Sequence, residues 1–336
     1  MNRLTMATTV LAVISGLICC GADSATDTVM GNWEGSWYGD TGGEGTLSAQ
    51  VINQGKGNYR AVMKADIGEP EPARGVMQGK RKGDSVQFKG TVDAGAALGG
   101  IYQCTGHILA GTFTGRYTGP DSEGSFRMKK VRKTSPTLGA KPPEGAIVLF
   151  DGKDLSRWVT NREGNPNPWK PVDGAMEVRG GDIVTKDRFG DFKLHLEFRV
   201  PLMEEARGQG RGNSGVFLPG NCEELQVLDS FGFEPSKGSC GAIYDQKPPR
   251  VNASLPPGEW QTYDITCLVP RFDEKDNMIQ KTILTVHHNG VLIHDRFPAK
   301  RKTNRRHGDH FRGILLQDHG NPARFRNIWL VPLKPE

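Results

Sequence analysis

A carboxylate and an amide share one face of an apolar stretch in the second half of the sequence. Residues 223–229 read EELQVLD, and because side chains alternate along a strand, Glu224 and Gln226 lie on one face of it. Asp229 falls on the opposite face of a regular strand, but one β-bulge would bring both carboxylates together. Two carboxylates about 5–5.5 Å apart are typical of a retaining glycosidase. The alternative is a solvated edge strand that happens to carry acids.

A second polar run contains a histidine suited to proton transfer. In residues 315–320, LLQDHG, the side chains of Gln317 and His319 share one face. Histidine has an ordinary pKa of about 6.5, which suits a general base near neutral pH. The alternative is a histidine that is only hydrogen-bonded within its strand. We expect the catalytic residues to be Glu224, His319 and Asp229.

Other polar and aromatic residues could hold a sugar. Asn213 opens a strand with small polar groups, as in many carbohydrate sites, or else marks a plain turn. Tyr244 could stack on a sugar ring or fill the core. Arg326 could orient a substrate hydroxyl or pair structurally with one of the two carboxylates. Together with Gln226 and Gln317, these are the expected substrate-binding residues.

Several common catalytic motifs do not occur in the sequence. It has no P-loop, no G-x-G-x-x-G after a strand, no G-x-S-x-G and no H-E-x-x-H. Phosphate-binding, dinucleotide-binding, serine hydrolase and zinc protease functions are therefore not expected. A net charge of +5, spread over 43 basic and 38 acidic residues, gives no reason to expect a nucleic-acid partner.

The elements that must position these residues are strands. Apolar and polar residues alternate strictly over 191–200, which indicates a half-buried strand. Residues 282–288 and 291–295 flank Asn289-Gly290, which is typical of a hairpin with a type I′ turn. No stretch has a long helical period, and the 44 glycines favour tight turns. The second half is expected to be a β-sandwich or jelly roll.

Short alternating runs also fill the first half of the chain. They predict a small antiparallel β-barrel or sandwich, so that the whole protein is expected to be all-β. Residues 132–145 are rich in Pro, Gly and charge, and indicate a linker. The expected domains are therefore 26–131 and 146–334. The runs lie at 46–52, 59–67, 85–92, 101–109, 111–117 and 125–131.

The N-terminus has the pattern of an export signal. Arg3 supplies a positive charge, residues 7–18 are apolar and small residues follow, so residues 1–25 are expected to be a signal peptide. The apolar stretch is too short to span a membrane. Cys19 or Cys20 as a lipoprotein anchor is the alternative, and it is the one route by which we expect membrane contact. The mature protein is expected in the periplasm or outside the cell.

Four further cysteines would remain in an exported protein. Cys222 and Cys240 bracket one loop, which favours this pair for a disulfide. The equal alternative is that Cys104, Cys222, Cys240 and Cys267 are all thiols.

Ordered blocks in the second half resemble the 3-keto-disaccharide hydrolase domain family. The resemblance covers about residues 145–334, and the first half has none that we can name. It implies a concanavalin A-like jelly roll that acts on glycosides whose glucose is oxidised at carbon 3. The blocks are VLFDGKDLSRW (148–158), DFKLHLEFR (191–199), NSGVF (213–217), ELQVLD (224–229), GEWQTYDI (258–265), and LLQDHG (315–320) followed by FRNI (325–328).

The chemistry that the resemblance implies needs a base and an acid. A 3-keto group acidifies the proton on carbon 2, so a base can remove it and expel the aglycone from carbon 1, with or without later addition of water. We expect His319 or Glu224 to be the base and Asp229 or Glu224 the acid. The amides and Arg326 would form a polar cradle for the enolate.

Cofactors and partners follow from the same chemistry. No cofactor is certain, but a divalent metal held by carboxylates and His319 could replace Arg326 as the electrophile. The sequence has no nicotinamide site, so a separate oxidoreductase would have to form the oxidised glycoside. The alternatives are a non-catalytic carbohydrate-binding protein and a conventional retaining glycosidase.

Overall fold

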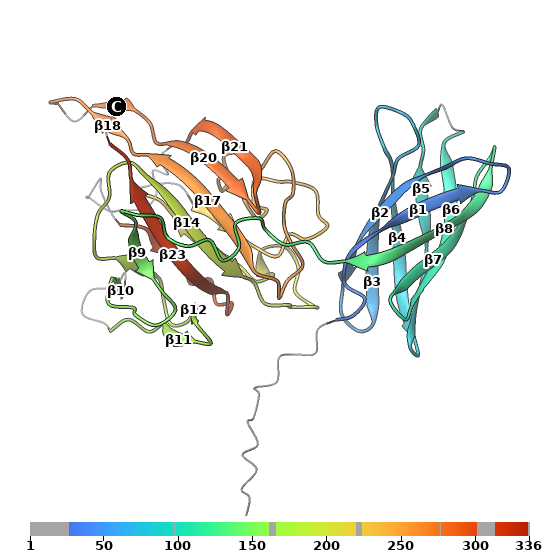
Figure 1. Ribbon diagram of the computed structural model, residues 1–336, viewed down its shortest axis with the longest axis horizontal. Coiled ribbons are helices and arrows are strands. Elements are labelled where there is room, and N and C mark those ends of the chain that lie inside the picture. Colours follow the sequence, from blue (N-terminus) through green and yellow to red (C-terminus); the bar gives the residue numbers. More distant parts are fainter. Residues whose placement is uncertain are drawn as a thin grey trace, which may run out of the picture.

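The computed structural model describes residues 27–96, 99–160, 166–219, 224–275, 277–300 and 313–334. Within these ranges the chain forms two β domains joined by one connecting segment, which confirms the predicted all-β class (Figure 1). The expected signal peptide and the alternative lipoprotein anchor lie outside the described residues. In the part that is described, no helix has the length and apolar character needed to cross a membrane.

Eight antiparallel strands form a closed barrel in the first domain. Each strand pairs with the next along the chain, and the last pairs with the first. Closure leaves no open sheet edge. Phe113 packs at the centre of one end, with its ring centroid 4.9 Å from that of Phe88 and 6.0 Å from that of Trp33. The strands are β1 (Gly31–Gly39), β2 (Glu44–Asn53), β3 (Asn58–Ala65), β4 (Ala73–Lys82), β5 (Ser85–Asp93), β6 (Ile101–Leu109), β7 (Thr112–Thr118) and β8 (Glu123–Val131).

Two antiparallel sheets pack face to face in the second domain. The five-stranded sheet has the order β10 (Trp158–Thr160), β13 (Ile183–Thr185), β22 (Leu315–Leu316), β15 (Ser214–Phe217), β16 (Glu224–Val227). The eight-stranded sheet has the order β11 (Lys170–Val172), β12 (Ala175–Glu177), β23 (Arg324–Pro332), β14 (Phe192–Arg199), β17 (Gln261–Leu268), β20 (Ile283–His288), β21 (Val291–Pro298), with β9 (Ile147–Phe150) paired to β23. The other elements are β18 (Arg271–Phe272), β19 (Met278–Gln280) and a 3₁₀ helix, η2 (Gly208–Gly210).

Strand alternation decides which side chains enter the core between the sheets. Leu194 and Leu196 of β14 and Leu225 of β16 are buried in one apolar cluster, as the alternating pattern predicts. A half-buried strand would leave the other face of β14 open to water. His195 and Glu197 on that face are nevertheless only 1% and 0% exposed, because another part of the chain covers them.

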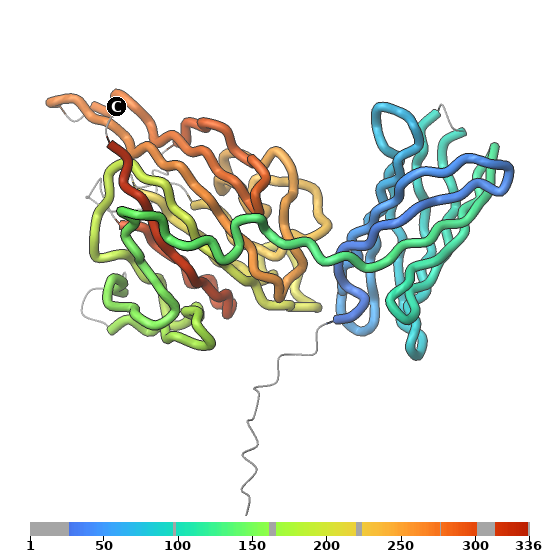
Figure 2. Tube along the Cα trace, in the orientation of Figure 1, coloured from blue at the N-terminus to red at the C-terminus, as the bar shows by residue number. Residues whose placement is uncertain are grey.

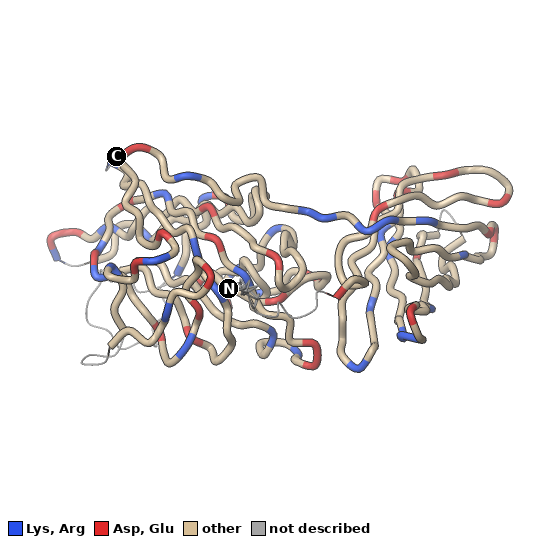
Figure 3. Tube along the Cα trace, turned by 60° about the horizontal axis from the view of Figure 1, so that its bottom comes forward, with Lys and Arg blue, Asp and Glu red and all other residues tan. Residues whose placement is uncertain are grey.

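The cover is the connecting segment, residues 132–145, which crosses the outer face of the eight-stranded sheet (Figure 2). Thr137 Oγ1 donates a hydrogen bond of 2.7 Å to Asp264, and the backbone N–H of Gly139 donates one of 2.6 Å to Glu197. Lys and Arg residues lie along the segment between the two domains (Figure 3). The segment is thus a bound strap on the second domain rather than a free spacer.

The barrel contacts the second domain at the end where β1 begins and β8 ends. Asn53, at the end of β2, donates from Nδ2 to Glu204 at 2.8 Å, and Arg60 of β3 donates to the carbonyl of Gly232 at 3.2 Å. The opposite end of the barrel therefore faces away from the second domain.

The predicted hairpin is confirmed. Asn289 and Gly290 have φ angles of 52° and 79°, the left-handed values that a type I′ turn requires, and they join β20 to β21. Asn favours this conformation among residues with a side chain, and Gly has no Cβ to oppose it.

The predicted Cys222–Cys240 disulfide is wrong. Cys240 is a free thiol that is 1% exposed, and its Sγ lies 3.1 Å from the hydroxyl of Tyr263. Cys222 itself lies outside the described residues. Position in a loop therefore did not predict that Cys240 is buried among core side chains, where it behaves as a small apolar residue.

Candidate active site

The outer face of the five-stranded sheet carries most of the predicted site residues. Gly215 of β15 pairs with Gln226 of β16, and Phe217 pairs with Glu224. Residues that pair directly across two strands project to the same side, so these four residues share one face. The opposite face, which includes Leu225, packs into the core.

Glu224 and Gln317 use the space that a side chain at residue 215 would fill. A Cβ on Gly215 would lie 2.9 Å from Glu224 Oε1 and 3.2 Å from Gln317 Oε1. The backbone of Gln317 is held in place here, because its N–H donates to the Gly215 carbonyl at 3.0 Å and its carbonyl accepts from Ser214 Oγ at 2.7 Å. The absence of a side chain at Gly215 therefore allows two side-chain oxygens to approach the same point.

One glutamine sets the orientation of two further amides. Gln209 of η2 donates from Nε2 to the Gly238 carbonyl at 2.8 Å, which leaves its Oε1 as an acceptor. This oxygen accepts from Asn213 Nδ2 at 3.1 Å and from Gln226 Nε2 at 2.7 Å. The orientation of an amide side chain is assigned from such contacts. Here Asn213 and Gln226 both direct their nitrogens toward Gln209, so their oxygens point away from it. Within the described ranges, the oxygens of both amides and Gln317 Oε1 are buried without a hydrogen-bond partner.

Glu224, Asn213, Gln226 and Gln317 are named the acceptor cluster below. A buried polar atom without a partner costs about 1–3 kcal/mol, so the cluster suits a ligand that supplies hydrogen-bond donors or positive charge. Sugar hydroxyl groups are donors of this kind. Among the residues that the structure describes, no group of three or more His, Cys, Asp or Glu side chains is placed to hold a metal ion.

Two other predicted residues are connected to the acceptor cluster, Tyr244 by a backbone hydrogen bond and His319 by its position in the sequence. The backbone N–H of Tyr244 donates to the carbonyl of Glu224 at 2.9 Å, and the tyrosine side chain is half-buried. His319 follows Gln317 by two residues and is exposed. The neighbouring Asp318 carboxylate accepts the backbone N–H groups of Gly320 and of the distant Gly181, both at 2.7 Å. The structure therefore presents an imidazole to solvent close in sequence to the cluster.

Asp229 does not join these residues. Its carboxylate pairs with the guanidinium of Arg211, and both residues are buried. It also accepts the N–H of Phe231 at 3.3 Å. Burial raises the pKa of Asp229, and Arg211 acts against that rise. The predicted role of Asp229 as the catalytic acid is not supported, because its carboxylate is committed to a structural ion pair.

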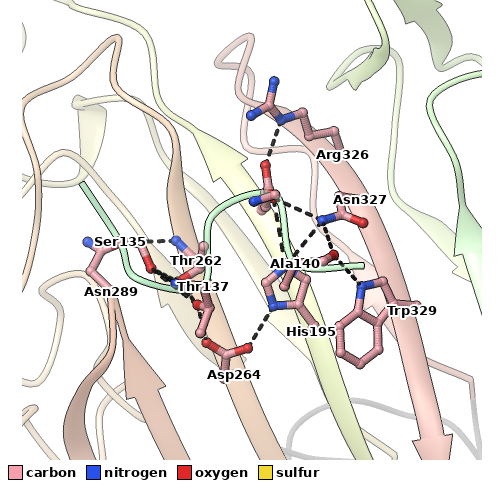
Figure 4. A network of polar contacts seen from close by, with 12 residues as sticks. Ser135, Thr137, Ala140, His195, Thr262, Asp264, Asn289, Arg326, Asn327 and Trp329 are labelled. Carbon is pink, nitrogen blue, oxygen red and sulfur yellow. Dashed lines mark hydrogen bonds and ion pairs between the residues drawn. The ribbon is translucent and has the colours of Figure 1, made fainter. Parts of the chain in front are cut away.

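Arg326 lies on the other side of the sandwich. It belongs to β23 of the eight-stranded sheet, and its Nε donates to Glu197 Oε2 at 2.6 Å (Figure 4). Its guanidinium carbon lies 4.0 Å from the centroid of the Trp260 ring. The register pairs Arg326 with Glu197, so both point to the face opposite the core. The alternative that Arg326 pairs with Glu224 or Asp229 is therefore wrong, and the predicted substrate-binding Arg326 lies on a different sheet from Glu224.

The Arg326 contact is part of a buried network beneath the connecting segment (Figure 4). His195 Nδ1 lies 2.6 Å from Asp264 Oδ1, and its Nε2 lies 3.8 Å from Glu197 Oε1. Burial alone would lower the pKa of His195, but Asp264 and Glu197 outweigh it and raise the pKa to about 8. Burial would raise the pKa of Glu197, but hydrogen bonds from His195, Asn327 and others lower it to about 2. The network holds charged groups that bind the segment to the sheet.

Gln209 and Gly215 shape the site without having been predicted. Gln209 lies in the glycine-rich run GQGRGN, which reads as an ordinary loop. Its effect depends on contacts with Asn213, Gln226 and Gly238, which are separated from it in the sequence or lie in other elements, and the sequence contains no signal for them. Gly215 lies inside one of the blocks that carry the family resemblance, and that block was the available clue.

Comparisons with known proteins show the family to which the chain belongs. The family described as a 3-keto-alpha-glucoside-1,2-lyase-like domain matches residues 145–331, which contain the whole acceptor cluster. A 3-keto-disaccharide hydrolase of Bacteroides thetaiotaomicron is 24% identical over 273 residues, which cover 69% of this chain and 94% of that protein. A crystal structure of a predicted glycosyl hydrolase from Parabacteroides distasonis is 40% identical, with a TM-score of 0.52 over 57% of this chain and 85% of that chain. The chain described here belongs to the family of 3-keto-alpha-glucoside-1,2-lyase-like domains.

Proposed function

We propose that this protein is an exported enzyme that cleaves 3-keto-glycosides at the acceptor cluster. The observation that carries the proposal is the burial of three amide oxygens that have no hydrogen-bond partner among the described residues, one of them close to the Glu224 carboxylate. A sugar brings several hydroxyl donors to such a surface. Membership of the family supports the choice of an oxidised glycoside.

The reaction proceeds as an elimination. A base removes the proton from carbon 2, and the electron pair of that C–H bond forms an enolate with the keto group at carbon 3. Collapse of the enolate forms the double bond between carbons 1 and 2 and breaks the bond from carbon 1 to the aglycone oxygen. An acid returns a proton to that oxygen. The product is a 2-hydroxy-3-keto-glucal, and water can then add to it.

Glu224 and His319 share the acid and base roles. Asp229 is held by Arg211, so these two are the remaining titratable groups of the predicted catalytic set. Glu224 is anchored in a strand with its carboxylate beside Gln317, whereas His319 is exposed to solvent two residues after Gln317. A positioned acid or base typically contributes about 10²–10⁴-fold to rate.

A hard divalent cation fits the same oxygens. Carboxylate and amide oxygens are the ligands that Ca²⁺ and Mg²⁺ prefer, and Glu224 with Gln317, Gln226 or Asn213 would supply them. Such an ion would contribute positive charge near the keto oxygen. Arg326 cannot supply that charge, because it lies on the other sheet. The amide side chains themselves orient the sugar by accepting its hydroxyl groups.

The test compares a chromogenic glucoside with its 3-keto derivative, with and without EDTA. Aglycone release from the keto form alone is the expected result, and loss of release with EDTA would add the metal. Glu224→Gln should reduce turnover by about 10²-fold or more. The exposed Glu234→Gln is the matched control and should leave turnover unchanged.

Other outcomes identify the competing functions. Release from the unoxidised glucoside would indicate a conventional glycosidase. Sugar binding without release from either compound would indicate a carbohydrate-binding protein. His319→Gln should lower turnover, with His287→Gln as its control, and an undiminished rate would remove His319 from the mechanism. A separate oxidoreductase would supply the keto substrate in the periplasm or outside the cell.

A further inference from the structure

The N-terminal barrel holds an apolar cavity that the proposed reaction does not use. Its volume is about 100 Å³, and all eight strands contribute to its wall. The lining includes Trp37, Leu47, Met63, Val92 and Tyr102. Apolar cavities of about 150 Å³ in other proteins take up benzene, so a cavity of this size that opens at one end suits a ring or the end of an alkyl chain.

The cavity opens at the end of the barrel that faces away from the second domain. Trp37 and Val92 come from the last residues of β1 and β5, and Leu47 and Tyr102 from the first residues of β2 and β6. In an up-and-down barrel these positions all meet at one end. At the other end, where Asn53 contacts the second domain, Trp33, Phe88 and Phe113 fill the interior.

Aromatic rings and acidic residues surround the mouth. Trp37 and Tyr117 are partly buried there in an edge-to-face arrangement, with ring centroids 6.3 Å apart. The mouth residues 40–44, 64–74, 93 and 116–123 carry eight acidic side chains against Lys64 and two arginines. Both arginines are already paired, Arg116 with Asp40 at 2.5 Å and Arg74 with a glutamate at 4.0 Å. The mouth is therefore strongly negative.

We propose that this cavity binds a small hydrophobic cation, such as an alkylammonium ion. The apolar tail would enter the cavity, and the charged head would stay at the mouth among the carboxylates and beside the faces of Trp37 and Tyr117. Aromatic faces and acidic residues both attract a cation, whereas the carboxylate of a fatty acid would be repelled. Burial raises the pKa of Cys104 in the cavity wall to about 11, so the wall itself carries no charge at neutral pH.

Titration of the full chain with octylammonium, octanol and octanoate tests the charge preference. Calorimetry should show that octylammonium binds at least about tenfold more tightly than octanoate, a difference of about 1.4 kcal/mol. Its affinity should fall as salt rises from about 0.01 M to 1 M, because the screening length falls from about 30 Å to 3 Å. Equal or tighter binding of octanoate, or binding of none of the three, would overturn the proposal.

Two variants locate the binding. Ala94→Phe, at the partly buried cavity mouth, should abolish binding, and Ile101→Phe, at a position 57% exposed on the barrel surface, should not. The double variant Glu69→Gln and Glu71→Gln changes only exposed residues, and it should weaken octylammonium binding but not octanol binding. Undiminished octylammonium binding in Ala94→Phe would place the ligand elsewhere and refute the proposal. Turnover of 3-keto-glycosides provides an independent readout, since none of these residues belongs to the acceptor cluster.

Discussion

Raising the pH through 8 should lower the free energy of unfolding of the second domain, because protonated His195 stabilises the contact with the connecting segment. His195 and Asp264 lie 2.6 Å apart, and Thr137 of the segment donates to the same carboxylate at 2.7 Å. The pKa of His195 rises from an ordinary value of 6.5 to about 8 in the folded protein. Its contribution to the free energy of unfolding is therefore complete below pH 6.5 and is lost as the pH rises through about 8.

The expected size of the effect follows from the pKa difference. Each unit of pKa corresponds to about 1.4 kcal/mol, so the loss between pH 6.5 and about 9 approaches 2 kcal/mol. Burial of His195, at 1% exposure, limits screening by solvent. The stability lost on deprotonation comes from the charge on the His195 imidazole. Packing of the ring against Trp329, whose ring centroid is 4.9 Å away, does not depend on that charge.

Urea unfolding at several pH values, followed by tryptophan fluorescence, measures this loss. His195→Asn is the matched variant, because it keeps a polar side chain but does not titrate. The difference in unfolding free energy between the parent and the variant should shrink by about 2 kcal/mol as the pH rises from 6.5 to 9. Because the parent and the variant are compared at the same pH, the contributions of the other titrating groups to the unfolding free energy cancel. A difference that stays constant over this range would refute the reasoning.

Three further predictions concern other buried groups and the site. Burial lowers the pKa of His288 to about 3, so the free energy of unfolding should fall as the pH drops below 6.5. Acid unfolding curves of His288→Gln should show a smaller fall over the same pH range. Gly215→Ala should reduce turnover of the 3-keto-glucoside, because the added methyl group would lie 2.9 Å from Glu224 Oε1, whereas Gly190→Ala, with open space around it, should not. Asp229→Asn should destabilise the protein by about 3–5 kcal/mol through the unpaired Arg211, with turnover per folded molecule retained. Loss of that turnover in correctly folded protein would return Asp229 to the active site.

Short-range patterns predicted much of the strand structure. The alternating run at β14 and the Asn289-Gly290 turn were read correctly, because each depends on neighbouring residues alone. Strands β1 and β4 were not predicted. Their sequences, GNWEGSWYG and ARGVMQGKRK, contain glycines and charges that weaken an alternating pattern, and it is pairing on both sides in the barrel that makes them strands.

The sequence could not show which sheet contains each of the predicted site residues. The structure brings Glu224 and Gln317 together, since β16 and β22, the strand that Gln317 follows, lie on either side of β15. Arg326 also stands at a polar position in an apolar strand, and nothing in its local sequence separates it from the other two. Only the strand order shows that β23 belongs to the other sheet. Alternation identifies the face of a strand but not the sheet that contains it.

The two outer faces of the sandwich differ in how their polar groups are satisfied, and this difference locates the site. On the eight-stranded sheet, His195 and Glu197 find partners in the connecting segment and in Asp264, so that face is closed by the protein itself. On the five-stranded sheet, Gln209 uses the nitrogens of Asn213 and Gln226 and leaves their oxygens unsatisfied among the described residues. Unsatisfied acceptors that the chain maintains at a cost in stability are best explained by a ligand that supplies the missing donors. The outer face of the five-stranded sheet is therefore where substrate should be sought.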